Sequence, residues 1–175
     1  MKNPIPLGIL SNQFLSDARA YLVAADILIR DGSADVNQPA YFLMSHALEL
    51  MLKAYILARG VSYDEVVSLG HNIQRAHARA ETLGLRVEGD HTRILIERLS
   101  EFHDAFIFRY PVVKKDDGHL ILRGALVYPA EVLKIIETIF LRVNGPVIMA
   151  RLDAAREGSF PIETWHMGRP APEQE

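Results

Sequence analysis

The stretch SHALELMLKAYILARG, residues 45–60, decides the fold of this chain. Nearly every position is apolar, but His46, Glu49 and Lys53 interrupt the run. On an α-helix these three positions, at i, i+3 and i+7, form one polar stripe. A helix that is apolar around most of its circumference is packed by neighbours on two or three sides. The segment therefore predicts a central helix over about 39–59 that ends at Gly60, with the stripe marking its one polar side.

The polar stripe has two interpretations. Glu49 and Lys53 stand at i and i+4 with the acid first, which is the favourable order for an ion pair, and His46 lies one turn before Glu49. In the first interpretation the stripe is a narrow solvated face, and the ion pair contributes about 0.2–0.5 kcal/mol. In the second, the three side chains form a polar cluster inside a cleft or at a subunit interface. The sequence leaves both open.

Apolar spacing predicts further helices around the central one. Ser11 is a candidate N-cap for the first, and SYDE (62–65) fits a capping box that opens a short one. In the last long helix, Asn-Gly-Pro (144–146) is expected to break or kink the chain, with a short helix following to Arg156. The expected helices besides the central one span about 11–30, 62–70, 72–83, 90–108 and 129–143.

One segment has a different texture. VVKKDDGHLILRGALVY (112–128) contains two β-prone runs around Asp117-Gly118, which is a strong hairpin signal. The sequence thus predicts an all-α fold, an up-and-down bundle of four to five helices with a small β-hairpin inserted before the last long helix. Residues 1–157 form the expected helical bundle, and 158–175 form a Pro-rich C-terminal arm.

Composition limits the classes of function. The chain has 175 residues, of which 49% are hydrophobic and 23% charged, and it contains no cysteine, so disulfides and cysteine chemistry are excluded. The net charge of −3 supplies no global attraction to nucleic acid or anionic lipid, so RNA binding would need a local basic patch. We find no signal peptide and no apolar run of membrane-spanning length, and we expect a cytoplasmic protein without membrane contact.

Two motifs resemble the HEPN domain family. They are HALELMLKAYILARG (46–60) and GHNIQRAHARAETLGL (70–85), separated by the short helix. Many members of that family show E-L-x-L-K, a Gly about ten residues on, and Gly-His before the next helix. The resemblance covers roughly residues 11–110. It implies a helical domain that dimerises and binds RNA or a nucleotide, often within a prokaryotic toxin–antitoxin or defence system.

The resemblance also implies a catalytic pair. Catalytic family members carry an Arg, then four to six residues, then a His, and RLSEFH (98–103) fits with Arg98 and His103. In metal-independent RNA cleavage a His transfers protons near neutral pH, and an Arg stabilises the charge that builds on the phosphate. The alternative is an amphipathic helix on which Arg98 extends to solvent and His103 packs at the core edge, since the two flank its apolar stripe.

Other residues extend the candidate site. The resemblance brings His71, which follows Gly70, towards the polar stripe, so that His46, Glu49, Lys53, His71 and Arg75 are the candidate binding residues. An equally simple role for Gly70-His71 is a helix C-cap followed by the start of the next helix. The histidine spacings do not predict a metal site, and neither GxGxxG nor a Walker loop is present, so no cofactor is expected.

Two functional hypotheses follow. The first is a HEPN-like homodimer that binds RNA or a nucleotide and cleaves RNA without a metal through Arg98 and His103. The second is a non-catalytic dimerisation or scaffold module whose partner is another protein, such as an antitoxin. In the second hypothesis the stripe of His46, Glu49 and Lys53 has a structural role.

Overall fold

The structure, a computed structural model, describes residues 5–32, 36–87, 89–104, 115–116, 119–120 and 128–157. Within these ranges the chain forms six helices and one pair of two-residue strands. In chain order the elements are α1 (Leu7–Asp31), α2 (Asn37–Ala58), α3 (Tyr63–Ser68), α4 (Ile73–Thr82), α5 (Asp90–Asp104), β1 (Lys115–Asp116), β2 (His119–Leu120) and α6 (Pro129–Glu157).

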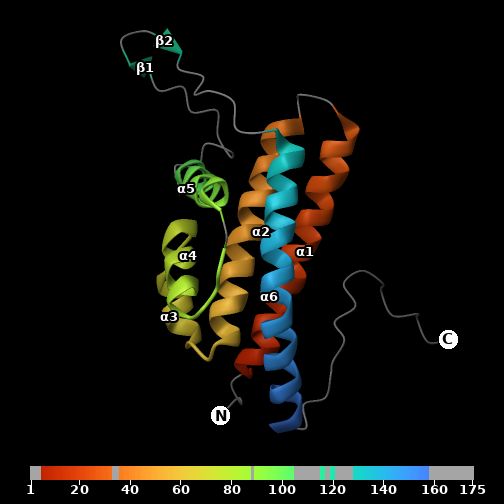
Figure 1. The fold of residues 1–175 in the computed structure, drawn as a ribbon, viewed down its shortest axis with the longest axis vertical. Coiled ribbons are helices and arrows are strands. Elements are labelled where there is room, and N and C mark those ends of the chain that lie inside the picture. The colour runs from red at the N-terminus through yellow and green to blue at the C-terminus, as the bar shows by residue number, and fades with distance from the viewer. Residues whose placement is uncertain are drawn as a thin grey trace, which may run out of the picture.

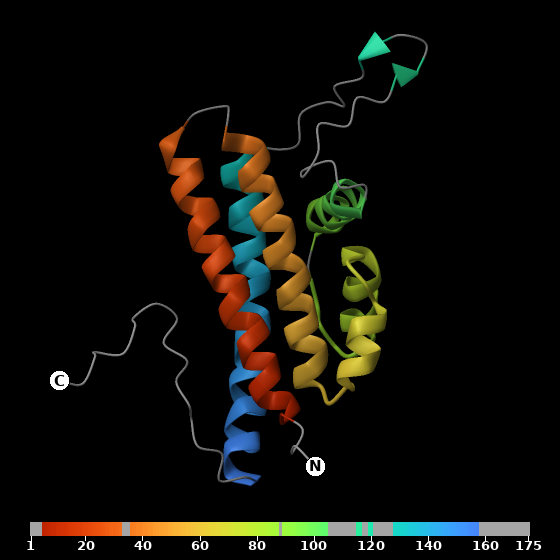
Figure 2. The same cartoon turned by 180° about the vertical axis from the view of Figure 1, so that it is seen from behind.

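The α2 helix lies at the centre of the fold. It packs against α1 and α6 on one side and against α4, α5 and the short α3 on the other (Figure 1). The view from behind shows the same arrangement, with three long helices side by side and the short helices on the far side of α2 (Figure 2). The prediction that residues 39–59 form the innermost helix is therefore confirmed, with the helix starting two residues earlier.

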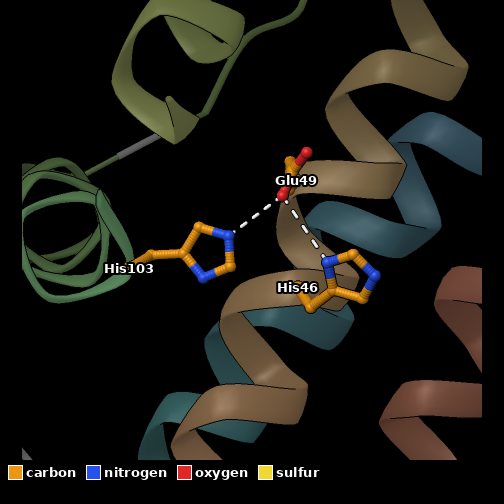
Figure 3. A group of neighbouring side chains, drawn as sticks. All are labelled: His46, Glu49 and His103. Carbon is orange, nitrogen blue, oxygen red and sulfur yellow. Dashed lines mark hydrogen bonds and ion pairs between the residues drawn. The ribbon is translucent and has the colours of Figure 1, made fainter. Parts of the chain in front are cut away.

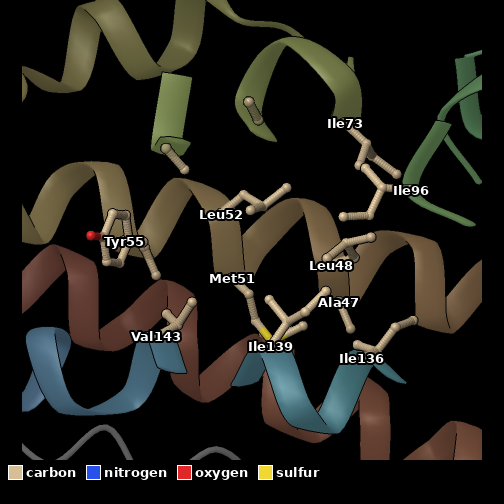
Figure 4. Close-up of a cluster of buried hydrophobic side chains, with 14 of the residues drawn as sticks. Ala47, Leu48, Met51, Leu52, Tyr55, Ile73, Ile96, Ile136, Ile139 and Val143 are labelled. Atoms are coloured by element: carbon tan, nitrogen blue, oxygen red, sulfur yellow. The ribbon is translucent and has the colours of Figure 1, made fainter. Parts of the chain in front are cut away.

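Burial explains why this segment is helical and central. Every residue from 51 to 57 is buried, so the apolar run has neighbours on all sides. Met51 lies towards Ile139 of α6, whereas Leu52 lies towards the side of α4 and α5 (Figure 4). Each such side chain contributes about 1.5–3 kcal/mol through removal from water. Two separate layers of helices therefore share one core through α2.

The first helix begins earlier than the sequence predicts. Its first residue is Leu7, and Pro6 precedes it as an N-cap without a side-chain hydrogen bond. Ser11 is consequently not an N-cap: it is fully buried inside the helix, and its Oγ donates a hydrogen bond of 2.9 Å to the carbonyl of Ala54. The serine thus satisfies its hydroxyl between two packed helices. By contrast, Ser62 caps α3 as predicted by accepting from the Glu65 amide.

The predicted break in the last long helix is absent. Pro146 lies inside α6, which runs continuously from Pro129 to Glu157. A proline in a helix interior removes one backbone hydrogen bond and costs about 3 kcal/mol. Here Val143 and Val147, one before and one after the proline, are both fully buried. Packing of these side chains offsets the local cost, and the helix continues.

The fold is all-α as predicted, but the inserted β-hairpin is wrong. The described fold is helical, and between α5 and α6 the described extended pairing is limited to Lys115 with Leu120 and Asp116 with His119. Two residues per strand are too few to form a hairpin of independent stability. The Asp117-Gly118 signal therefore predicted a hairpin that the described residues do not form. The remaining residues of 112–128, except Tyr128, lie outside the described residues, as does the predicted arm at 158–175.

None of the described helices combines the length with the apolar content that crossing a bilayer requires.

One close approach between helices occurs where α1 begins. Gly8 lies against the backbone of Ala150 in α6, and a Cβ at position 8 would clash with the Ala150 carbonyl and touch Ala154. We therefore expect Gly8→Ala to lower the free energy of unfolding by about 1–3 kcal/mol through overpacking. Urea denaturation measures this, with Ser16→Ala, exposed on the same helix, as the control that stays within about 0.5 kcal/mol. Equal stability of the two variants would contradict the close packing.

Candidate functional site

A buried carboxylate lies at the centre of a group of basic side chains. Glu49 is 1% exposed and is surrounded by His46, Lys53, His71 and His103, and these five residues are called the Glu49 cluster below. The two oxygens of Glu49 have different neighbours. Oε1 accepts from Lys53 Nζ at 2.6 Å, and His71 Nδ1 lies 3.2 Å from it. Oε2 lies 3.0 Å from His103 Nε2 and 3.5 Å from His46 Nδ1 (Figure 3).

Three parts of the chain supply these side chains. His46, Glu49 and Lys53 are the polar stripe of α2, which helical spacing places on one side of that helix. His103 comes from the last turn of α5, whose axis crosses beside α2 at this point (Figure 3). His71 lies in the turn between α3 and α4. The cluster therefore joins α5 and the turn between α3 and α4 to the central helix α2.

The turn that carries His71 is fastened to the cluster. Gly70 adopts a left-handed conformation with φ of 64°, which a glycine tolerates without strain, and this lets the chain turn sharply after α3. The carbonyl of Gly70 accepts a hydrogen bond of 2.6 Å from Lys53 Nζ. The same ammonium thus binds Glu49 and the turn. Gly70-His71 serves both as the helix end and as the link to α2.

Burial decides between the two interpretations of the polar stripe. Glu49 and Lys53 are buried, and the His46 side chain is mostly covered. The solvated-face interpretation is therefore wrong, because α4 and α5 cover this side of α2. The His71 side chain differs from the rest of the cluster because it is 62% exposed. It forms the contact between the cluster and water.

The neighbouring charges determine the ionisation of Glu49. Burial by itself raises the pKa of Glu49, because the charged form loses its water. The side chains of His103, His46 and Lys53 act in the opposite direction and outweigh burial. The pKa of Glu49 consequently lies far below its ordinary value. The carboxylate is ionised at neutral pH and accepts a hydrogen bond from the Lys53 ammonium, and His71 and His103 lie within hydrogen-bond distance of it.

Aromatic rings hold two of the imidazoles in place. Tyr21 of α1 meets the His46 ring edge-on at a centroid distance of 4.7 Å. Phe42 stacks near both His46, at 6.2 Å, and His103, at 6.4 Å. The two imidazoles themselves are 6.2 Å apart with planes inclined by 23°. Neither aromatic residue was anticipated from the sequence, because their role depends on the packing of α1 and α5 against α2.

The structure places Arg98 away from the Glu49 cluster. Arg98 lines a groove of about 480 Å³ between α5 and α6, together with His91, Lys134 and Glu131. His103, by contrast, turns inward to α2 and has a side chain that is 2% exposed. Within one chain, the two residues of the predicted catalytic pair, Arg98 and His103, therefore lie in different places: one in the surface groove and one in the buried cluster.

Arg75 occupies a third position. It is exposed in the first turn of α4, and its backbone amide donates to the Asn72 side chain that caps the helix. Of the predicted binding residues, the structure brings together His46, Glu49, Lys53 and His71. Arg75 is close to His71 in the sequence, but it is exposed at the surface. The sequence did not indicate that His103 joins them, because 54 residues separate it from Glu49.

The Glu49 carboxylate is expected to control stability in acid. Its pKa is lower in the folded chain than in the unfolded chain, where it is about 4.3, so the ionised group stabilises the fold above that pH. This contribution is lost as the pH falls through and below that value. Glu49→Gln leaves the Lys53 ammonium buried without its counter-charge and should lower the free energy of unfolding by about 3–5 kcal/mol at pH 7.

Urea denaturation at pH 7, 4.5 and 3 measures the effect. The difference between the original chain and Glu49→Gln should shrink between pH 4.5 and 3, while Glu101→Gln, exposed on α5, should behave like the original chain at each pH. A difference that stays constant from pH 4.5 to 3 would show that the pKa of Glu49 is not lowered in the folded chain.

Comparison with known proteins places no family name on this arrangement. No protein-family model, no curated protein and no solved structure matches the chain. The HEPN resemblance therefore stays a prediction that rests on the two motifs at 46–60 and 70–85 and on the Arg–His spacing at 98–103.

Proposed function

We propose that the chain binds RNA or a nucleotide in the cytoplasm and cleaves RNA without a metal, with the Glu49 cluster as its acid–base site. The observation that carries the proposal is the position of His71. Its Nδ1 faces the buried carboxylate, and its ring is mostly exposed. A carboxylate–imidazole pair of this kind, open to solvent on one side, is one arrangement that general acid–base catalysis uses.

The chemistry follows from the tautomer that Glu49 favours. An ionised carboxylate accepts the Nδ1–H of His71, which leaves Nε2 of the ring without a proton and able to act as a base. In RNA cleavage Nε2 takes the proton of the 2′-hydroxyl, the 2′-oxygen forms a bond to phosphorus, and the bond to the 5′-oxygen breaks. The departing 5′-oxygen takes a proton from water. No step requires a metal.

The proposal assigns different roles to the two histidines. The His103 ring is buried against Glu49, so it acts as a positioning residue that holds the carboxylate rather than as a group that meets RNA. His71 takes the catalytic role that the spacing at 98–103 suggested for His103. Lys53 binds Glu49 and ties it to the turn of His71.

Exposed cations in two places, the start of α4 and the groove between α5 and α6, supply phosphate binding. Arg75 lies four residues after His71, in the first turn of α4, and offers a guanidinium that can bind a phosphate with two hydrogen bonds. Arg98 and Lys134 contribute further positive charge along the groove between α5 and α6. Because the chain as a whole is acidic, binding depends on these local groups and should weaken as salt rises.

The test is cleavage of a labelled RNA in the presence of EDTA. His71→Ala should reduce the rate by about 10²–10⁴, the usual contribution of a general acid–base group. Arg75→Ala should weaken RNA binding in a filter assay with little change in the rate at saturation. Ser16→Ala is the control, since it changes an exposed residue of α1 that lies outside both the Glu49 cluster and the groove between α5 and α6.

Two results would overturn this assignment. Cleavage by His71→Ala at the original rate would remove His71 from the reaction, and loss through Arg98→Ala and His103→Ala alone would favour the pair at 98–103. Absence of both RNA cleavage and RNA or nucleotide binding by the original chain would refute the proposal as a whole. Circular dichroism of each variant separates a lost function from a lost fold.

The second candidate function is a dimerisation or scaffold module that binds a protein, such as a second copy or an antitoxin. The observation in its favour is an apolar stripe on α6. Leu141, Ile148 and Leu152 recur at helical spacing and are exposed, with Met149 beside them. An exposed apolar stripe of this kind is typical of helix-mediated association.

Sedimentation equilibrium tests the association of two chains through α6. We expect the original chain to sediment as a dimer and Leu141→Glu with Leu152→Glu to shift it to the monomer, because each carboxylate would have to be buried in the interface. Val23→Glu, at an exposed apolar position of α1, is the control that should leave the dimer intact. A monomeric original chain, or a double variant that remains dimeric, would exclude this face as the dimer interface.

A further inference from the structure

The inner side of the Glu49 cluster holds the carboxylate but does not meet RNA in the function proposed above. Lys53 contacts Oε1, and His71 lies slightly closer to Oε1 than to Oε2, at 3.2 and 3.4 Å. Oε2 points to the interior, where His46 and His103 approach it (Figure 3). We propose that His46, Glu49 and His103 bind a divalent transition-metal ion of the zinc class on this inner side.

The distances suit a shared metal ion. One possible ligand atom from each of His46, Glu49 and His103 lies within 4.8 Å of the other two. Ligands of a tetrahedral zinc ion at about 2.0–2.1 Å from the metal are roughly 3.3 Å apart. The separations from Oε2, 3.0 Å to His103 and 3.5 Å to His46, bracket that value. An ion would need only small side-chain movements to enter.

A second observation concerns His46 alone. Its Nδ1 is fully buried, and among the described residues it has no partner with hydrogen-bond geometry, although Glu49 lies within ion-pair distance. Buried polar nitrogens without a partner are rare in folded proteins. Because the ring is fixed by Tyr21 and Phe42, Nδ1 stays directed at Oε2. A metal ion between the two atoms would supply the missing partner.

The kind of ligand determines the kind of ion. Two imidazoles and one carboxylate favour zinc and its neighbours in the first transition series, whereas magnesium and calcium prefer oxygen ligands throughout. Three protein ligands leave a fourth position of the tetrahedron for water. In the sequence, His46 and Glu49 stand at i and i+3 on one helix, and the third ligand is distant, which is why histidine spacing did not indicate the site.

Lys53 opposes the ion and provides a directional test. Its ammonium lies 2.6 Å from Oε1 of the same carboxylate, so a metal on Oε2 would feel its positive charge at short range. Replacement by the uncharged Lys53→Met should therefore increase the affinity for zinc. A purely structural hydrogen-bond network would not produce that gain.

A bound ion would join two helices. His46 and Glu49 belong to α2, and His103 belongs to the last turn of α5. Metal coordination would thus fasten the end of α5 to the central helix and stabilise the folded chain in proportion to zinc concentration. This inference does not depend on RNA cleavage, which is measured in EDTA and relies on His71.

The experiment uses the full chain after removal of metals with EDTA. Isothermal titration with ZnCl₂ should give one bound ion per chain, and thermal denaturation should show a rise in Tm that MgCl₂ does not produce. His46→Ala and His103→Ala should each weaken zinc binding by at least about 100-fold, more than the loss typical of an outer-shell partner. His91→Ala and His71→Ala should retain the affinity.

X-ray absorption of the original chain with zinc gives a test that does not require the variants to fold. It should show two imidazole nitrogens and at least one oxygen ligand. Absence of zinc binding, unchanged affinity in both His46→Ala and His103→Ala, or unchanged or weaker binding by Lys53→Met would overturn the proposal. If zinc binds while RNA is not cleaved, the metal site stands and the proposed function fails. If RNA is cleaved while zinc does not bind, the proposed function stands and the metal site fails.

Discussion

The ionised carboxylate of Glu49 is the constraint on which the arrangement of the short helices depends. A charge without water in the interior of a protein is tolerated only when paired groups and hydrogen bonds replace the solvent. Here the replacements come from α2 itself, from the turn before α4 and from the end of α5. The positions of α4 and α5 therefore satisfy an electrostatic requirement as well as an apolar one. Leu48 and Leu52 supply the apolar contacts beside it (Figure 4).

Helix positions were predictable where the signals were local. The run at 45–60 indicated a central helix because its apolar residues cover most of the circumference, and the structure places it there. Ser62 and Gly70 marked helix ends through capping chemistry and a left-handed turn. The ion pair of Glu49 with Lys53 was also indicated, because i, i+4 spacing leaves few alternatives. These features depend on residues within two turns of one another.

The wrong predictions concern features that depend on packing between residues far apart in the sequence. Ser11 looks like a cap, but its hydroxyl finds an acceptor in α2. Pro146 looks like a break, yet the buried valines on either side keep α6 whole. The pairing of His103 with Glu49 had no local signal, since it depends on where α5 lies against α2. Spacing therefore predicted most members of the Glu49 cluster but not the contact of His103 with Glu49. It also paired Arg98 with His103, although Arg98 lines the groove between α5 and α6 and His103 contacts Glu49.

The bond from Lys53 to the carbonyl of Gly70 has a consequence for motions of the folded chain. Lifting α3 and α4 away from α2 would break this bond and leave both the ammonium and Glu49 short of partners. Such an excursion thus costs far more than fraying of a surface helix. The two short helices and the middle of α2 should behave as one cooperative unit, whose backbone amides exchange with deuterium together rather than one helix at a time.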